Sequence, residues 1–111
     1  MSGSYYLGLD IGTTGIKAVV FDGSGTQCGT GLSEYTLETP APDIVELDAE
    51  QYWISTKEAV KTAIENSGAA PEKIRAMSVT GQAETLIMTG ADHKPLRKAI
   101  VWLDNRAGRE A

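Results

Sequence analysis

Residues 10–17 read DIGTTGIK, and this stretch decides how the chain begins to fold. It joins two runs, 5–11 and 16–22, that are rich in apolar and β-branched residues. Two such runs around a glycine-flanked pair of residues predict a β-hairpin, with Thr13 and Thr14 at its tip. The sequence therefore indicates that the chain starts with two antiparallel strands.

The next residues extend this hairpin. The turn signal DGSG at 22–25 is followed by residues 26–37, which predict a third strand. The three strands form an antiparallel β-meander in sequence order. Residues 39–42 (TPAP) are typical of a loop, because two prolines and a threonine interrupt the pattern.

A long helix is predicted over 49–67. Asp48 can cap its N-terminus, Gln51 follows three residues later as in a capping box, and Gly68 provides a left-handed stop. The apolar residues recur at helical spacing, which predicts that Trp53 lies in the core. The segment thus has both a start signal and a stop signal.

Further strands are predicted over 74–80, 84–89 and 99–103, and Asn105 begins a segment typical of a helix. The predicted order of elements suits an α/β layer with a mixed sheet: three strands are followed by a helix, a further strand and a hairpin. A compact domain seldom stops one turn into a helix. We therefore expect a truncated domain, from a natural chain that continues past residue 111.

Composition excludes several functional classes. The 111 residues carry 15 acidic and 10 basic side chains without a basic run, which argues against nucleic-acid binding. The single Cys28 and the single His93 offer neither a disulfide nor a zinc motif. The sequence holds no apolar stretch of membrane-spanning length and no signal-peptide pattern, so we expect a cytoplasmic protein.

The hairpin at 10–17 has the residue types that bind phosphate. Glycines allow a tight turn and a close approach of the backbone, and turn amides and hydroxyls donate to phosphate oxygens. A carboxylate at a strand end can hold Mg²⁺, and a lysine neutralises phosphate charge. The candidate cofactor-binding residues are Asp10, Gly12, Thr13, Thr14 and Lys17, with Asp10 as the metal ligand.

A purely structural interpretation fits the same residues. A two-residue loop places Asp10 opposite Lys17, where the two side chains can form a cross-strand ion pair. The glycines then only make a good turn. The residues of the hairpin alone leave both interpretations open.

Four segments in register resemble the FGGY family of carbohydrate kinases. These are DIGTTGIK at 10–17, VELDAEQYW at 45–53, IRAMSVTGQ at 74–82 and PLRKAIVWLDNR at 95–106. The resemblance covers nearly the whole chain. It implies the ribonuclease H-like fold of the actin, Hsp70 and sugar kinase superfamily, with residues 1–111 as the N-terminal part of the first domain and the nucleotide-binding second domain absent.

The resemblance also implies a reaction, in which the γ-phosphoryl group of ATP passes to a hydroxyl of a sugar or polyol with the help of Mg²⁺. The general base of the family is an aspartate far downstream, so no catalytic residue is expected in this chain. Closure of two lobes excludes water in such kinases. We therefore expect the 111 residues alone to be inactive.

The resemblance places the acceptor beside the third and fourth of these segments. The implied substrate-binding residues are Gln82, Glu84, Trp102, Asp104 and Arg106. The residue types leave alternatives open, since Trp102 could instead be a core aromatic, and Asp104 and Arg106 could tie the strand end by a salt bridge. Glu84 matches glycerol kinase-like members, but Ala83 stands where they have Arg, and the Met-His that follows the Gln in xylulokinase-like members is also missing. A ketopentose such as xylulose is the acceptor that we favour.

Rival functions remain. A short protein with this fold could be a non-catalytic module that binds phosphate or a partner, and another enzyme of the superfamily, such as a hexokinase-like protein, fits less of the sequence. A truncated sheet also exposes an edge strand, which predicts self-association.

Overall fold

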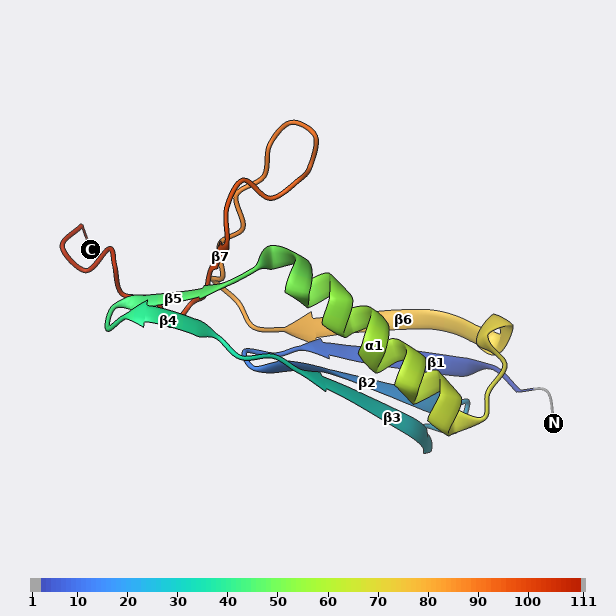
Figure 1. Cartoon of the computed structure of the whole chain (residues 1–111). Helices are drawn as coiled ribbons and strands as arrows, with labels where there is room; N and C mark the ends of the chain where they lie inside the picture. Colours follow the sequence, from blue (N-terminus) through green and yellow to red (C-terminus); the bar gives the residue numbers. More distant parts are fainter. Residues whose placement is uncertain (1–2, 111) are drawn as a thin grey trace.

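Residues 3–110 are described by a computed structural model, in which a mixed sheet is covered on one face by a long helix (Figure 1). The sheet has the order β3-β2-β1-β6. β2 is antiparallel to both of its neighbours, whereas β6 is parallel to β1. The predicted meander is confirmed, and its strands are β1 (Tyr5–Ile11), β2 (Gly15–Asp22) and β3 (Gln27–Glu34), with β6 (Ile74–Gly81) beside them.

Helix α1 (Ala49–Ser67) has the bounds that the sequence predicts. The Asp48 carboxylate accepts a hydrogen bond from a backbone N–H of the first turn, and Gly68 ends the helix with a φ of 70°. The predicted capping box does not form, because the Gln51 side chain donates to the Ser55 hydroxyl at 2.9 Å. The cap therefore rests on Asp48 alone.

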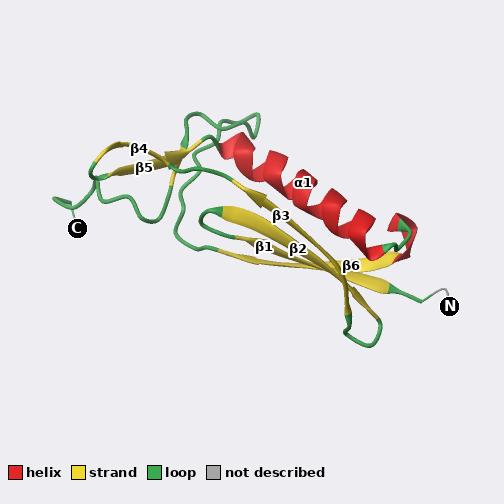
Figure 2. Cartoon of the chain, turned by 60° about the horizontal axis from the view of Figure 1, so that its bottom comes forward, coloured by secondary structure: helices red, strands yellow, loops and turns green. Residues whose placement is uncertain are grey.

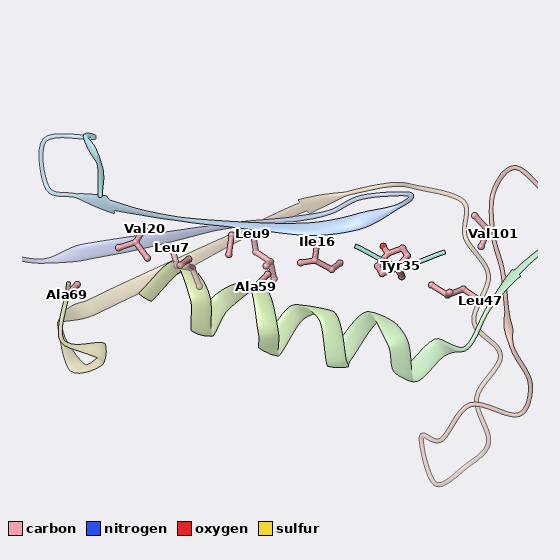
Figure 3. Packing of buried hydrophobic residues seen from close by; sticks show 11 residues of the cluster. Leu7, Leu9, Ile16, Val20, Tyr35, Leu47, Ala59, Ala69 and Val101 are labelled. Carbon is pink, nitrogen blue, oxygen red and sulfur yellow. The ribbon is translucent and has the colours of Figure 1, made fainter. Parts of the chain in front are cut away.

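The core lies between α1 and the sheet, where the buried side chains of alternate strand positions meet the helix (Figure 3). The period of two in β1 and β2 places one set of apolar residues toward the helix. The sheet contributes Leu7, Leu9, Ile16, Ala18 and Val20 to this core.

The helix face that packs against β3 is built from small residues. Ala59 and Ala63 are fully buried above the glycines of β3. A Cβ added at Gly31 would lie 2.0 Å from the carbonyl oxygen of Ala59, so helix and strand are almost in backbone contact. The prediction that Trp53 lies in the core is wrong, because this close approach admits no large side chain and Trp53 is 59% exposed at the helix flank.

A second, smaller sheet follows the main one and has the order β4-β5-β7. It contains β4 (Glu38–Ala41), β5 (Ile44–Leu47) and β7 (Ala99–Ile100). The predicted loop at 39–42 is therefore wrong for its first three residues. Pro40 is compatible with a strand because β4 is the edge of its sheet.

The other predicted elements beyond β6 are shortened or absent. Residues 84–89 form no strand and make only the isolated bridges Leu86 to Ile100 and Thr89 to Pro95. The strand expected over 99–103 reduces to two residues, and turns replace the expected helix after Asn105. These segments project away from the main sheet, where few neighbours stabilise regular structure (Figure 1).

A groove of about 500 Å³ runs between α1 and the edge strand β6. Tyr52, Trp53 and Val60 line it from the helix, and Met77 and Val79 line it from β6. Figure 2 shows that α1 crosses a single face of the main sheet. Within residues 3–110, no helix is both long enough and apolar enough to cross a membrane.

Candidate functional site

The tip of the β1–β2 hairpin is held tightly by its own backbone. The Gly12 N–H donates to the Gly15 carbonyl oxygen at 2.9 Å, which closes a loop that has Thr13 and Thr14 at its tip. A Cβ at Gly12 would lie 2.8 Å from the Gly15 carbonyl oxygen, so only glycine fits there without a shift. The two threonines are thus presented at the end of the main sheet.

Asp10 and Lys17 are direct partners in the β1–β2 register, as the sequence predicts. No ion pair joins them, however, among the residues that the structure describes. Both side chains line a hollow of about 290 Å³ on the sheet face opposite α1, together with Ser78 and Thr80 of β6. The ion-pair interpretation of the hairpin therefore fails, and both charges remain available to a ligand.

A second hollow, of about 400 Å³, connects the hairpin to the segment that follows β6. It is lined by Thr13 and Trp102 and by the consecutive residues Gln82, Ala83 and Glu84. Three of the five predicted acceptor-binding residues thus lie beside a predicted phosphate-binding residue. Trp102 is 47% exposed, so it forms a wall of this hollow rather than part of the core.

Hydrogen bonds fix the walls of this hollow to one another. The Trp102 indole Nε1–H donates to the Thr13 hydroxyl at 2.9 Å, and the Trp102 backbone N–H donates to the Thr85 hydroxyl at 3.2 Å. Thr85 donates in turn to the Gln82 Oε1 at 2.9 Å, and the Gln82 Nε2 donates to the Gly12 carbonyl oxygen at 3.3 Å. The hairpin tip, the turn after β6 and Trp102 therefore form one connected frame.

Tyr35 also supports this frame, although it belongs to none of the motifs that predict the site. Its hydroxyl donates to the Gly12 carbonyl oxygen, and its ring packs edge-on against Tyr52 at 5.5 Å between centroids. Burial, with smaller contributions from Tyr52 and Asp10, raises the pKa of Tyr35 to about 12. In the strand predicted over 26–37, a period of two puts Gly31, Ser33 and Tyr35 on one face, and this shared face is the signal that could have identified Tyr35.

Glu84 adopts a left-handed backbone conformation with a φ of 68°. Such values are uncommon for residues other than glycine and occur often at ligand sites. Its carboxylate makes no hydrogen bond within residues 3–110 and lies at the hollow. Glu84 is therefore the acidic group of this hollow that a ligand can use.

Asp104 and Arg106 lie apart from this hollow and bind one another. Two guanidinium nitrogens of Arg106 donate to the Asp104 carboxylate at 2.7 and 2.8 Å, and Asp104 also accepts from the Val45 N–H at 2.7 Å. The hydrogen bond from Arg106 holds the pKa of Asp104 well below its usual range. Arg106 bonds Glu46 as well, at 2.9 Å, so the pair ties the end of the chain to β5.

Comparison with known proteins gives a consistent result. Residues 5–111 match the sequence model of the FGGY family of carbohydrate kinases, N-terminal domain. The glycerol kinase of Bordetella pertussis is 43% identical over 103 residues, which cover 92% of this chain and 20% of that protein. The glycerol kinase of Trichormus variabilis is 42% identical over 106 residues, or 95% of this chain and 21% of that protein.

Solved structures share the fold. The gluconate kinase of Lactobacillus acidophilus superposes with a TM-score of 0.86 and 28% identity over 97% of this chain and 21% of that chain. The xylulose kinase of Rhodospirillum rubrum gives a TM-score of 0.85 and 26% identity over 96% of this chain and 22% of that chain. The chain thus spans about a fifth of the length of the relatives that it matches.

Proposed function

The chain belongs to the FGGY family of carbohydrate kinases, and on that premise we propose that residues 1–111 are the N-terminal part of the first domain of a longer kinase. The longer protein transfers the γ-phosphoryl group of ATP to a hydroxyl of a sugar or polyol. The observation that carries this proposal is the hollow where Thr13 of the hairpin lies beside Glu84 and Trp102. A phosphoryl donor and an alcohol must meet at such a junction.

The hairpin supplies the phosphate side of the proposed site. The hydroxyls of Thr13 and Thr14 lie at the tip as donors, and Lys17 adds a positive charge nearby. Asp10 is the proposed metal ligand. No cluster of three or more metal-binding side chains exists within residues 3–110, which suits Mg²⁺, an ion that is typically held by one or two carboxylates, water and phosphate oxygens.

Glu84 and Trp102 supply the acceptor side. The Glu84 carboxylate accepts hydrogen bonds from acceptor hydroxyls, and the Trp102 indole face packs against the apolar C–H surface of the acceptor. The Gln82 amide already bonds Gly12, Tyr52 and Thr85, so it orients the turn more than it binds the acceptor. The contacts of Asp104 and Arg106 support the structural alternative for that pair.

The acceptor is proposed to be a small polyol, with glycerol as the first candidate. The relatives reported above with 42–43% identity over nearly the whole chain are glycerol kinases, whereas the xylulose kinase structure is 26% identical. This order differs from the initial preference for a ketopentose such as xylulose, for which the residues of the turn gave no specific support. Ala83, in place of a long side chain, leaves the hollow open to larger acceptors as well.

The chain alone is proposed to be inactive and to act as part of a cytoplasmic enzyme. We propose that the general base that accepts the hydroxyl proton comes from the remainder of the longer protein. The rival proposal is a non-catalytic phosphate-binding module with the same hairpin. It predicts phosphate binding without transfer, at any chain length.

The test is ADP release from Mg·ATP by the longer protein, with a panel of glycerol, xylulose and gluconate. We expect release that depends on one acceptor and that Asp10→Ala lowers by at least about 100-fold, since phosphoryl transfer relies on metal and charge stabilisation. The 111-residue chain is the matched comparison and should release no ADP above its own Asp10→Ala variant. Acceptor-dependent release by the short chain would show that the proposal of a missing base is wrong.

Self-association of the 111-residue chain through β6 is also proposed. β6 has one sheet partner among the described residues, and it exposes Met77 and Val79. An uncovered strand edge of this kind pairs readily with a second copy. Light scattering after size exclusion should show a concentration-dependent dimer that Val79→Lys weakens, and a clean monomer at every concentration would contradict it.

A further inference from the structure

Trp102 uses both of its N–H groups within the frame of the hollow. Its backbone N–H bonds the Thr85 hydroxyl, and its indole Nε1–H bonds the Thr13 hydroxyl across 89 residues of sequence. An aromatic wall that served only as an apolar surface would not need the second bond. Within residues 3–110, no other hydrogen bond reaches the hydroxyl of Thr13 or Thr14 from the acceptor side.

The chemistry of the two groups fixes the direction of this bond. An indole N–H can only donate, whereas a threonine hydroxyl has one proton to donate and two lone pairs that accept. Trp102 must therefore occupy a lone pair of the Thr13 oxygen and leave the Thr13 proton unused. Within residues 3–110 the Thr13 hydroxyl donates no hydrogen bond, and Thr13 lines the hollow.

We propose that Trp102 is a positioning residue, whose indole N–H orients Thr13 so that the Thr13 hydroxyl proton is presented to an oxygen of the transferred phosphoryl group. This inference rests on the proposed kinase function and assigns Trp102 a second task besides its apolar face. The indole ring contacts the acceptor, and its N–H acts through Thr13 on the phosphate side.

The surrounding bonds make this arrangement stiff. From the Trp102 backbone N–H, hydrogen bonds run through Thr85 and Gln82 to the Gly12 carbonyl oxygen, which also accepts from the Tyr35 hydroxyl. Trp102 is therefore linked to two consecutive residues of the hairpin. It bonds Thr13 directly, and it is connected to Gly12 through Thr85 and Gln82. Donors that are fixed before the reaction stabilise developing charge without reorganisation cost.

The kinetic test uses the longer protein and compares Trp102→Phe with wild type. Phenylalanine keeps an apolar face and removes the indole N–H. We expect kcat to fall by about 2- to 10-fold, the factor that corresponds to one hydrogen bond. Trp53→Phe is the matched control, because it makes the same substitution at a tryptophan that does not line this hollow, and it should leave kcat unchanged.

A double-mutant cycle with Thr13→Val separates positioning from acceptor contact. Any rise in the KM of the acceptor that Trp102→Phe causes should persist when Thr13 is valine. Trp102→Phe should cause no further fall in kcat in the Thr13→Val background, because the hydroxyl through which Trp102 acts is absent there. An equal fall in kcat in both backgrounds would overturn the proposal.

A spectroscopic measurement tests the bond without any activity. The indole N–H proton of Trp102, identified in the ¹⁵N-resolved spectrum by its loss in Trp102→Phe, should move upfield in Thr13→Val and stay in place in Thr13→Ser. An unchanged resonance in Thr13→Val would overturn the inference even if the enzyme is an active kinase. A shifted resonance in a protein that phosphorylates no acceptor would contradict the proposed function instead.

Discussion

The Asp104 carboxylate is the most heavily bonded acidic side chain in the described part of the chain. Its side chain is only 3% exposed, and it accepts hydrogen bonds from Arg106 and from the backbone of Val45. These bonds favour the charged form, so the pKa of Asp104 is well below its usual range. The folded and unfolded chains therefore bind protons differently in acid.

Asp104→Asn should reduce the acid sensitivity of folding. A lowered folded pKa means that the stabilisation is fully present above the unfolded pKa, near 4, and is lost as the pH falls through that value toward the folded pKa. We expect the Tm of wild type to drop more steeply below pH 4 than that of Asp104→Asn. Thermal melts between pH 7 and pH 2 would measure this difference.

Asp43→Asn is the control for this comparison. Asp43 is an exposed residue whose side chain accepts no hydrogen bond among residues 3–110. Its variant should follow the wild-type dependence of Tm on pH. Parallel curves for wild type and Asp104→Asn would contradict the assignment of acid sensitivity to Asp104.

At the scale of elements, the contact of α1 with β3 depends on the absence of side chains at Gly29 and Gly31. A Cβ at Gly31 would meet the Ala59 carbonyl oxygen at 2.0 Å, and one at Gly29 would meet the Ser67 nitrogen at 2.4 Å. Neither neighbour is the flexible end of a side chain, so the whole helix would have to move. Overpacking of this kind typically costs about 1–3 kcal/mol.

Gly31→Ala should therefore lower the Tm of the chain by roughly 5 °C or more, a shift that corresponds to about 1 kcal/mol in a domain of this size. Differential scanning calorimetry provides the measurement. Gly23→Ala is the matched control, because its Cβ would meet only the Ser4 carbonyl oxygen at an ordinary 3.8 Å. A loss of stability as large in Gly23→Ala would show that the change from glycine to alanine itself, rather than contact with α1, is responsible.

The elements that could be predicted from sequence are those with local signals. The hairpin tip, the Asp48 cap and the Gly68 stop each depend on a few adjacent residues, and all three form as predicted. The rotation of α1 could not be predicted, because it depends on which residues of β3 lie below it. Glycines distant in sequence brought Ala59, rather than Trp53, to the sheet.

The site was predictable only in part, because its residues have local signals whereas the contacts between them depend on the tertiary fold. Thr13 and Trp102 were both expected at a ligand site, but the bond between them joins residues 89 apart and needs the tertiary fold. The only sequence signal for Tyr35 is that it falls on the same strand face as Gly31 and Ser33. The strand expected over 84–89 failed because Glu84 takes a left-handed conformation and few neighbours pair with that segment.

The whole molecule is elongated, with principal extents of 58 × 29 × 21 Å. The groove between α1 and β6 exposes an aromatic residue, Trp53, beside Met77 and Val79, which are 58% and 52% exposed. Apolar surface gathered in a groove binds small apolar molecules more strongly than scattered exposed residues do. The groove should therefore dominate the binding of an apolar dye.

Met77→Thr combined with Val79→Thr should lower the fluorescence gain of the dye ANS by at least about 2-fold, since both side chains lose apolar surface at the groove. Threonine is β-branched and therefore suits a strand at both positions. The matched control is Leu32→Thr with Leu96→Thr, which removes two exposed leucines outside the groove. Equal losses in the two double variants would indicate that the dye does not select the groove.

The uncovered β6 edge also has a consequence for protein synthesis. In a protein as long as the glycerol kinase relatives, about four-fifths of the chain is still untranslated when this lobe emerges from the ribosome. Translation adds about 5–20 residues per second, so the remainder of such a chain takes on the order of tens of seconds to follow. The nascent lobe must survive this interval beside other nascent chains, and β6 is the place where a chaperone would protect it.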